Sequence, residues 1–125
     1  MKNLILSAIA ILTSLSTFAN KDCEASLCAN TQEINKKELN FCKEIVLTNE
    51  NYKVWSFKLG YTKTNDDGTT NYIEFNGISN KIEESFLENF KTFTPEKLYL
   101  EEIIVVDENN EKFKLDNVVI TVRKE

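Results

Sequence analysis

The sequence predicts a small, mainly β (α+β) domain: an antiparallel, sandwich-like arrangement of about six strands with one amphipathic helix, preceded by a signal peptide. Two apolar runs, 98–106 and 118–122, are rich in Ile and Val, which pack well on a pleated surface. A charged turn centred on Asn109 and Asn110 separates them. A third segment, 52–63, alternates apolar and polar residues, as a half-buried strand does.

Residues 1–19 have the features of a secretory signal peptide. Lys2 precedes an apolar segment, 4–15, and small residues follow, which predicts cleavage after Ala19. The apolar segment is shorter than the roughly 20 residues that span a bilayer, so we expect no transmembrane segment in the mature chain. Cleavage leaves 106 of the 125 residues, the size of one domain, in the periplasm or outside the cell.

The charge of the chain argues against two classes of partner. Cleavage removes one of the 15 basic side chains and none of the 20 acidic ones, which leaves a net charge of −6. Nucleic acid needs clustered Lys and Arg, and so does binding to anionic lipid head groups. We therefore expect no nucleic-acid partner.

Three cysteines remain after cleavage, and an exported chain favours a disulfide. The candidate pairs are Cys23–Cys28, which is preferred, and Cys28–Cys42. The third thiol would stay free or join a second chain as a dimer. The sequence contains no histidine, so a zinc site would lack its usual fourth ligand, and we expect neither a metal nor another cofactor.

The mature chain is predicted to consist of a tail followed by a domain, which begins with a short helical turn and two extended segments. Residues 20–30 form an extended, cysteine-bearing tail, and 31–125 form the domain. Asn35 and Glu38 have the spacing of a capping box for a short helical turn, which leads into an extended segment at 45–47. In the strand 52–63, four side chains share one face: Trp55, Phe57, Leu59 and Tyr61. The residues before them have the opposite parity, which indicates a bulge near residues 55–56.

A turn at 65–68 connects this strand to a partner at 72–76. The helix follows at 80–93, with a capping box of Asn80 and Glu83. Its apolar stripe contains Ile82, Phe86 and Phe90, which we expect to pack on the sheet. In the strand 98–106 the alternation slips by one residue at 101–102, which predicts a second bulge. Strands 112–115 and 117–123 complete the set.

The sequence shows no catalytic equipment. It has no histidine for a general base or a nucleophile triad, and its three glycines do not form a phosphate-binding loop. We therefore predict that the chain is not an enzyme.

A sheet that does not close leaves edges on which another chain can add a strand. The candidate edges are 72–76 and 117–123. Basic residues surround the second edge, and they serve either as a charged guard against aggregation or as a docking rim. These residues are Lys112, Lys114, Arg123 and Lys124.

Several segments, in order, resemble the C-terminal domain of the gliding-motility and type IX secretion protein GldM. The matching segments are 34–39, 54–57, 79–82, 97–103, 115 and 118–122. The family's glycines near the last hairpin are replaced by Pro95-Glu96 and Asn109-Asn110. The resemblance implies a β-rich, non-catalytic interaction module that binds another envelope or secreted protein. The alternative function is a carrier of a small lipid or peptide, with a pocket between helix and sheet near Trp55 and Phe86.

Overall fold

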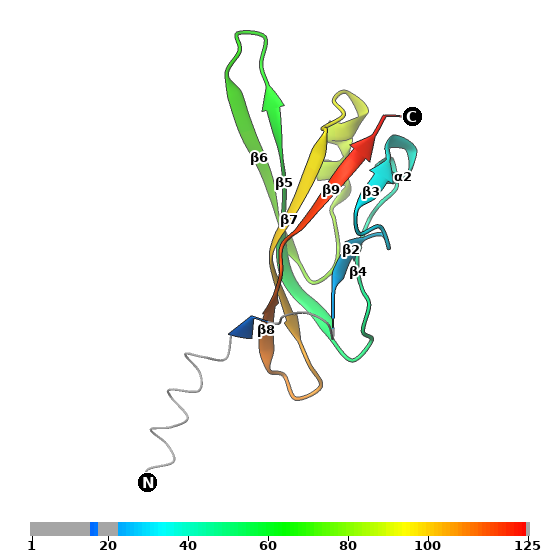
Figure 1. Cartoon of the computed structure of the whole chain (residues 1–125), viewed down its shortest axis with the longest axis vertical. Coiled ribbons are helices and arrows are strands. Elements are labelled where there is room, and N and C mark those ends of the chain that lie inside the picture. The colour runs from blue at the N-terminus through cyan, green and yellow to red at the C-terminus, as the bar shows by residue number, and fades with distance from the viewer. Residues whose placement is uncertain (1–15, 18–22, 125) are drawn as a thin grey trace.

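The computed structural model describes residues 16–17 and 23–124, which form two β-sheets (Figure 1). The strands are β1 (Ser16–Thr17), β2 (Ala25–Leu27), β3 (Glu33–Asn35), β4 (Ile45–Leu47), β5 (Lys53–Thr64), β6 (Thr70–Ile78), β7 (Lys97–Val106), β8 (Lys112–Leu115) and β9 (Val118–Arg123). The helices are α2 (Lys36–Asn40), α3 (Glu84–Leu87) and the 3-10 helix η1 (Glu88–Lys91). The mainly β class predicted from the sequence is confirmed.

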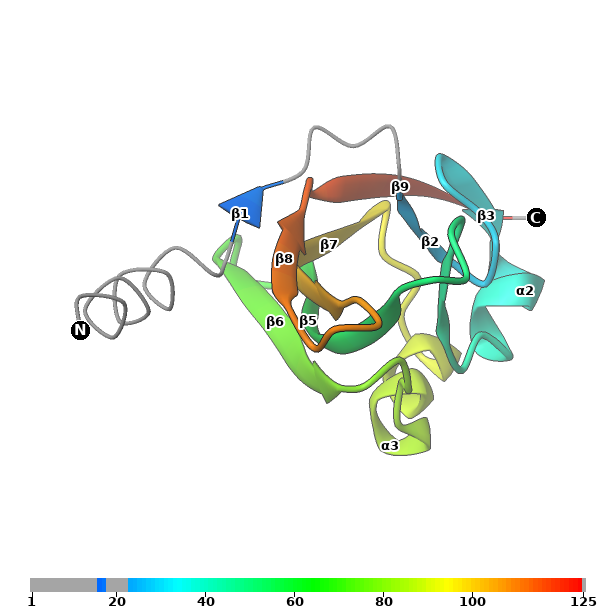
Figure 2. The same ribbon diagram turned by 90° about the horizontal axis from the view of Figure 1, so that it is seen from below.

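The larger sheet is organised around β7. On one side β7 pairs with β5, and on the other it pairs with β9 through its first half and with β8 through its second half. β6 lies beyond β5, β3 runs parallel to β9, and β1 runs parallel to β8. The small sheet of β2 and β4 lies against the concave side of the larger one (Figure 2). Apart from Ser16–Thr17, the predicted signal peptide lies outside the described residues.

Both predicted bulges are present. The register of β5 against β7 shifts between Val54 and Ser56 and again between Ser56 and Lys58. On β7, Glu102 has a φ of 46°, where an extra residue is accommodated between Glu101 and Ile103. The face predicted for Trp55 is wrong, however, because the bulge turns this side chain away from the core and leaves it 52% exposed.

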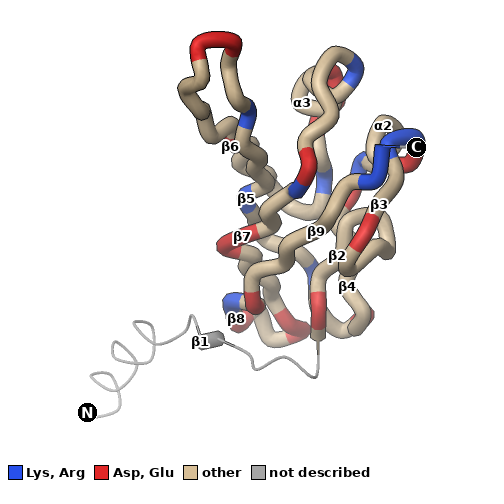
Figure 3. Tube along the Cα trace, turned by 45° about the horizontal axis from the view of Figure 1, so that its top comes forward, with Lys and Arg blue, Asp and Glu red and all other residues tan. Residues whose placement is uncertain are grey.

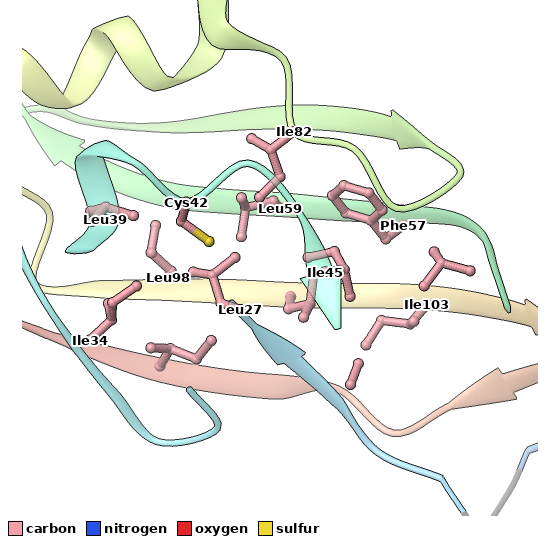
Figure 4. Close-up of a cluster of buried hydrophobic side chains, with 14 of the residues drawn as sticks. Leu27, Ile34, Leu39, Cys42, Ile45, Phe57, Leu59, Ile82, Leu98 and Ile103 are labelled. Atoms are coloured by element: carbon pink, nitrogen blue, oxygen red, sulfur yellow. The ribbon is translucent and has the colours of Figure 1, made fainter. Parts of the chain in front are cut away.

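The core lies between the two sheets and under the short helices (Figure 4). Phe57 and Leu59 of β5 and Leu98 of β7 are almost completely buried there. The predicted tail supplies part of this core, because Cys23, Ala25 and Leu27 are at most 2% exposed. Residues 25–27 are extended, as predicted, whereas the chain turns at Cys28 and Ala29, and the described part of the segment is integral to the domain.

The predicted long helix over 80–93 is wrong in its extent. Before α3 the chain is extended and bonded to the segment before β4: the Ile45 amide donates to the Asn80 carbonyl at 2.8 Å, and the Ile82 amide donates to the Lys43 carbonyl at 2.9 Å. The predicted Asn80 cap is therefore absent, and α3 begins after Glu83 without a side-chain cap. The stripe itself is buried as predicted, with Phe90 1% exposed. The capping box in front of α2 is also confirmed.

The disulfide joins Cys28 to Cys42, with 5.7 Å between their Cα atoms. The preferred prediction, Cys23–Cys28, is wrong because β2 keeps the chain between those residues extended. Five residues of strand span roughly 16 Å, whereas disulfide Cα atoms lie within about 7 Å. Cys23 is 1% exposed, so a dimer through this thiol is not supported.

Candidate interaction surface

The longest edge strand of the larger sheet is β6. Within the part of the chain that the structure describes, this strand pairs with β5 alone, over nine residues from Thr70 to Ile78. The edge predicted at 72–76 is therefore an edge, and it is longer than expected. The second predicted edge is wrong, because β9 pairs with β7 on one side and with β3 on the other.

The direction of the β6 backbone follows from the ladder with β5. Ser56 and Ile78 are paired, and the Ser79 amide donates to the Trp55 carbonyl at 2.9 Å. This geometry makes Ser56 and Ile78 a non-hydrogen-bonded pair, so alternate residues of β6 direct both backbone polar groups away from β5. These residues are 70, 72, 74, 76 and 78.

The exposed large apolar side chains concentrate on the outer face of this sheet, opposite the core. Among the described residues, five large hydrophobic side chains are classed as exposed, and four of them lie on this face. These four form the outer patch: Trp55 (52% exposed), Tyr72 (47%), Ile78 (83%) and Val119 (49%). The fifth, Phe41, follows α2, outside this sheet. Such a concentration is typical of binding surfaces.

The ring of Tyr72 lies over Gly60, whose lack of a side chain leaves room for it. A Cβ atom at Gly60 would collide with the phenol ring of Tyr72, which lies across the strand above it. The ring of Tyr99 lies beside it, with 6.4 Å between the ring centroids. Burial raises the pKa of the Tyr72 phenol, and the carboxylates of Glu101 and Glu74 raise it further. The tyrosine stays neutral at physiological pH.

At the other end of the patch, the ring of Trp55 is partly covered by a cation. The Nζ atom of Lys112 lies 4.1 Å from the ring centroid, within cation–π distance. Between the two ends, Lys58 and Glu102 form an ion pair of 3.8 Å on the same face. The outer face therefore alternates apolar contact area with polar groups, as protein interfaces do.

The four predicted basic residues do not form one cluster. Lys112 and Lys114 lie on β8, opposite Val106 and Ile104, at the lower end of the sheet in Figure 1. Arg123 lies near the C-terminus at the opposite end, where its Nε atom pairs with Glu33 at 3.2 Å.

Lys124 lines a shallow cleft of about 410 Å³ with Lys36 and Lys37. This second basic group lies near α2 (Figure 3).

The predicted ligand pocket is wrong in its geometry, because Trp55 and Phe86 lie on opposite faces of the sheet. Phe86 is 7% exposed and packs against Phe75 of β6, with 5.1 Å between the ring centroids. Space between the helix and the sheet is filled by this aromatic contact and by those of Tyr61 with Phe86 and Phe90.

Sequence reasoning identified β6 as an edge and missed two members of the outer patch. The alternation of residues 55–61 predicts Trp55 on the core face, whereas the opposite parity of Tyr52 and Val54 indicates the outer face, where it lies. The strand predicted at 72–76 ends too early to include Ile78. Gly77 instead continues the strand and makes room for the ring of Phe57.

Residues 16–17 and 23–124 contain no group of three or more His, Cys, Asp or Glu side chains that could hold a metal ion. Over the same ranges, no helix is long and apolar enough to cross a membrane. No family model matches the sequence, and no curated protein matches it.

Proposed function

We propose that this chain is an exported, non-catalytic module that binds another envelope or secreted protein through the outer patch. The observation that carries the proposal is the location of the exposed apolar residues. Trp55, Tyr72 and Ile78 share one face of two adjacent strands, beside the unpaired edge of β6. A solvated sheet face without a partner would more often carry polar side chains at these positions.

Two further observations support an exported interaction module. The Cys28–Cys42 disulfide is the kind of bond that persists in an oxidising compartment. The resemblance to the C-terminal domain of GldM implies a protein that works through contacts with other envelope proteins, in secretion or gliding. Both agree with the predicted signal peptide.

Site-specific photocrosslinking tests the proposal. A photoreactive phenylalanine analogue is introduced at Ile78 in the full chain, expressed in its native cells, and irradiated in intact envelopes. Phe41 is the matched control position, because it is 75% exposed and lies outside the outer patch. We expect the Ile78 variant to give a discrete crosslinked protein that mass spectrometry identifies, and the Phe41 variant to give none of it.

The specificity of the crosslink is tested by competition. Excess unlabelled wild-type chain should abolish the product, whereas a Trp55→Ala/Ile78→Asp chain should compete poorly. Equal crosslinking from both positions, or no protein adduct from Ile78 in native envelopes, would contradict the proposed function.

A further inference from the structure

We propose that the partner contributes an extended segment that adds to β6 as a strand, with a Lys or Arg opposite Glu74 and apolar residues on the core-facing side. This inference rests on the proposed function and specifies its binding mode and the chemistry of the partner.

The unpaired backbone of β6 is long enough to bind an extended segment. Five alternate residues of β6 direct their backbone polar groups away from β5, at positions 70, 72, 74, 76 and 78. The ladder with β5 is continuous from Ser56 opposite Ile78 to Thr64 opposite Thr70, without a register shift. A regular strand of nine residues offers an added segment a full set of hydrogen-bond partners.

β6 also lacks the usual protection of a sheet edge. Natural edges are shortened, bulged or provided with Lys or Pro, which discourages strand addition. The other edge strands of the larger sheet are short: β1 has two residues and β3 has three. β6 has nine residues and contains no Lys, Arg or Pro. Among the described edges, β6 is the one built to accept a strand.

The charge around β6 selects the partner. Glu74 lies at the middle of the edge, and Asp66 and Asp67 form the acidic turn at the tip of the β5–β6 hairpin (Figure 3). Of the two β5 lysines that pair with β6, Lys58 contacts Glu102 and Lys63 lies over the ring of Phe93. A residue that lies opposite Glu74 in an added strand has its side chain on the same face. A cation is therefore favoured at that position.

The core-facing side of the edge selects apolar residues. Ile73 and Phe75 are only partly buried, because no strand covers them on the far side of β6. On the core side, the ring of Phe75 stacks on the ring of Phe86. Apolar side chains on an added strand would complete this packing. The preferred segment thus alternates apolar and basic residues.

The same charges argue against a second copy of this chain as the occupant. If two β6 strands paired antiparallel around their centres, the two Glu74 side chains would lie opposite each other. Like charges directly opposite each other destabilise a strand pair. An unlike partner with a basic segment avoids this repulsion.

A peptide-binding experiment with the full exported chain tests the inference. The probe is a fluorescent nine-residue peptide that alternates valine and lysine, and its control alternates valine and glutamate. Asn76→Pro removes one outward amide without touching the ladder to β5, because edge strands tolerate proline there. Asn76→Ala is the matched control that keeps the amide. We expect Asn76→Pro to weaken binding of the lysine peptide roughly tenfold and Asn76→Ala to leave it nearly unchanged.

A second variant tests whether the charge of Glu74 selects a basic segment. Glu74→Lys should weaken binding of the lysine peptide and strengthen binding of the glutamate peptide, while urea unfolding shows that the variant stays folded. Equal affinity of the wild type and Asn76→Pro for the lysine peptide would overturn strand addition. If the Ile78 crosslink to a native protein persisted in Asn76→Pro, the interaction function would stand and this binding mode would fall. Loss of the crosslink at Ile78 in the otherwise wild-type chain would remove the function itself.

Discussion

Trp55 lies on the outer face of the sheet because a bulge in β5 shifts the alternation of its side chains. The alternation around it fits two parities, and only the position of the bulge decides which one applies. That position depends on how β5 pairs with β7, a strand more than 40 residues later in the sequence. The aromatic pattern could therefore predict a strand and a bulge, but not the side of the sheet on which the tryptophan lies.

Gly77 and Gly60 give a prediction at this scale. A Cβ atom at Gly77 would collide with the ring of Phe57, which is 2% exposed and enclosed by the core. Gly77→Ala should therefore lower the free energy of unfolding by about 1–3 kcal/mol, the range for overpacking. Gly60→Ala is the comparison, because the Tyr72 ring above it is 47% exposed and has room to move. Urea midpoints should show a smaller loss for Gly60→Ala, and equal losses would contradict this interpretation.

Phe90 and Trp55 separate core from surface among the aromatic residues. Phe90 is 1% exposed, so Phe90→Ala should cost about 3–5 kcal/mol, a large share of the 5–15 kcal/mol typical of a domain. Trp55→Ala should change stability by about 0.5 kcal/mol or less, as surface substitutions do. Urea denaturation of both variants measures the difference. A large loss for Trp55→Ala would show that its ring is structural and would weaken its assignment to a binding surface.

Tyr61 and Tyr72 predict how stability depends on alkaline pH. Burial raises the pKa of both phenols above the ordinary value of 10.0. The folded chain therefore holds these protons more tightly than the unfolded chain, and the resulting stabilisation is fully present below pH 10. It is lost as the pH rises through the folded-state values. Urea unfolding at about pH 9 and about pH 11 should show a steeper decline for wild type than for Tyr61→Phe/Tyr72→Phe. An equal loss of stability in wild type and in the double variant would contradict the raised pKa values of the two phenols.

At the scale of elements, the region 80–93 shows that local sequence can predict which residues are buried without predicting their conformation. Its periodicity identified Ile82, Phe86 and Phe90 as buried residues, and that prediction is confirmed. Periodicity did not reveal that residues 80–82 would bond to residues 43–45 instead of forming the first helical turn. The bonding partner is more than 30 residues away, so local sequence predicts the burial and long-range pairing decides the conformation.

The disulfide connects two other elements, the turn after β2 and the end of α2. Cys28 and Cys42 are 14 residues apart, and closing a loop of this size stabilises a fold by about 3 kcal/mol in the chain-entropy model. Reduction should therefore lower the urea midpoint of wild type. The variant Cys28→Ser/Cys42→Ser should start from a lower midpoint and show no response to the same reductant. If that variant responded equally, the effect of the reductant would have to arise elsewhere.

At the scale of the whole molecule, the edges were the hardest feature to predict. A sequence lists strands in order, whereas an edge is a strand that lacks a second neighbour. β9 is not an edge strand, because β3, a segment about 88 residues earlier, pairs with it in parallel. β6 kept its edge because it follows β5 through a tight turn and nothing else reaches it within the described chain. The candidate site was therefore half predictable: the strand was found, and its patch was not.

The position of the two β8 lysines in the whole molecule indicates their role. Lys112 and Lys114 lie on a short strand at the opposite end of the sheet from Arg123, so they do not form a continuous docking rim with it. β1, which pairs with β8, lies within the predicted signal peptide, so cleavage would leave β8 as an edge strand, where lysines discourage pairing with other chains. We therefore expect them to act as a guard. Replacing both with valine should produce self-association at concentrations where wild type stays monomeric, as measured by analytical ultracentrifugation.

The matched control is Lys112→Glu/Lys114→Glu, which reverses the charge but keeps the edge charged. This variant should remain as soluble as wild type, because either sign of charge opposes strand addition by another copy. Lys112 also lies over Trp55, so both variants should change the tryptophan fluorescence, which reports that the cation–π contact is lost in each. Self-association of the valine variant alone then isolates the guard role from that contact. If the glutamate variant kept its solubility and monomeric state but bound the envelope partner more slowly, the two lysines would belong to the docking surface instead.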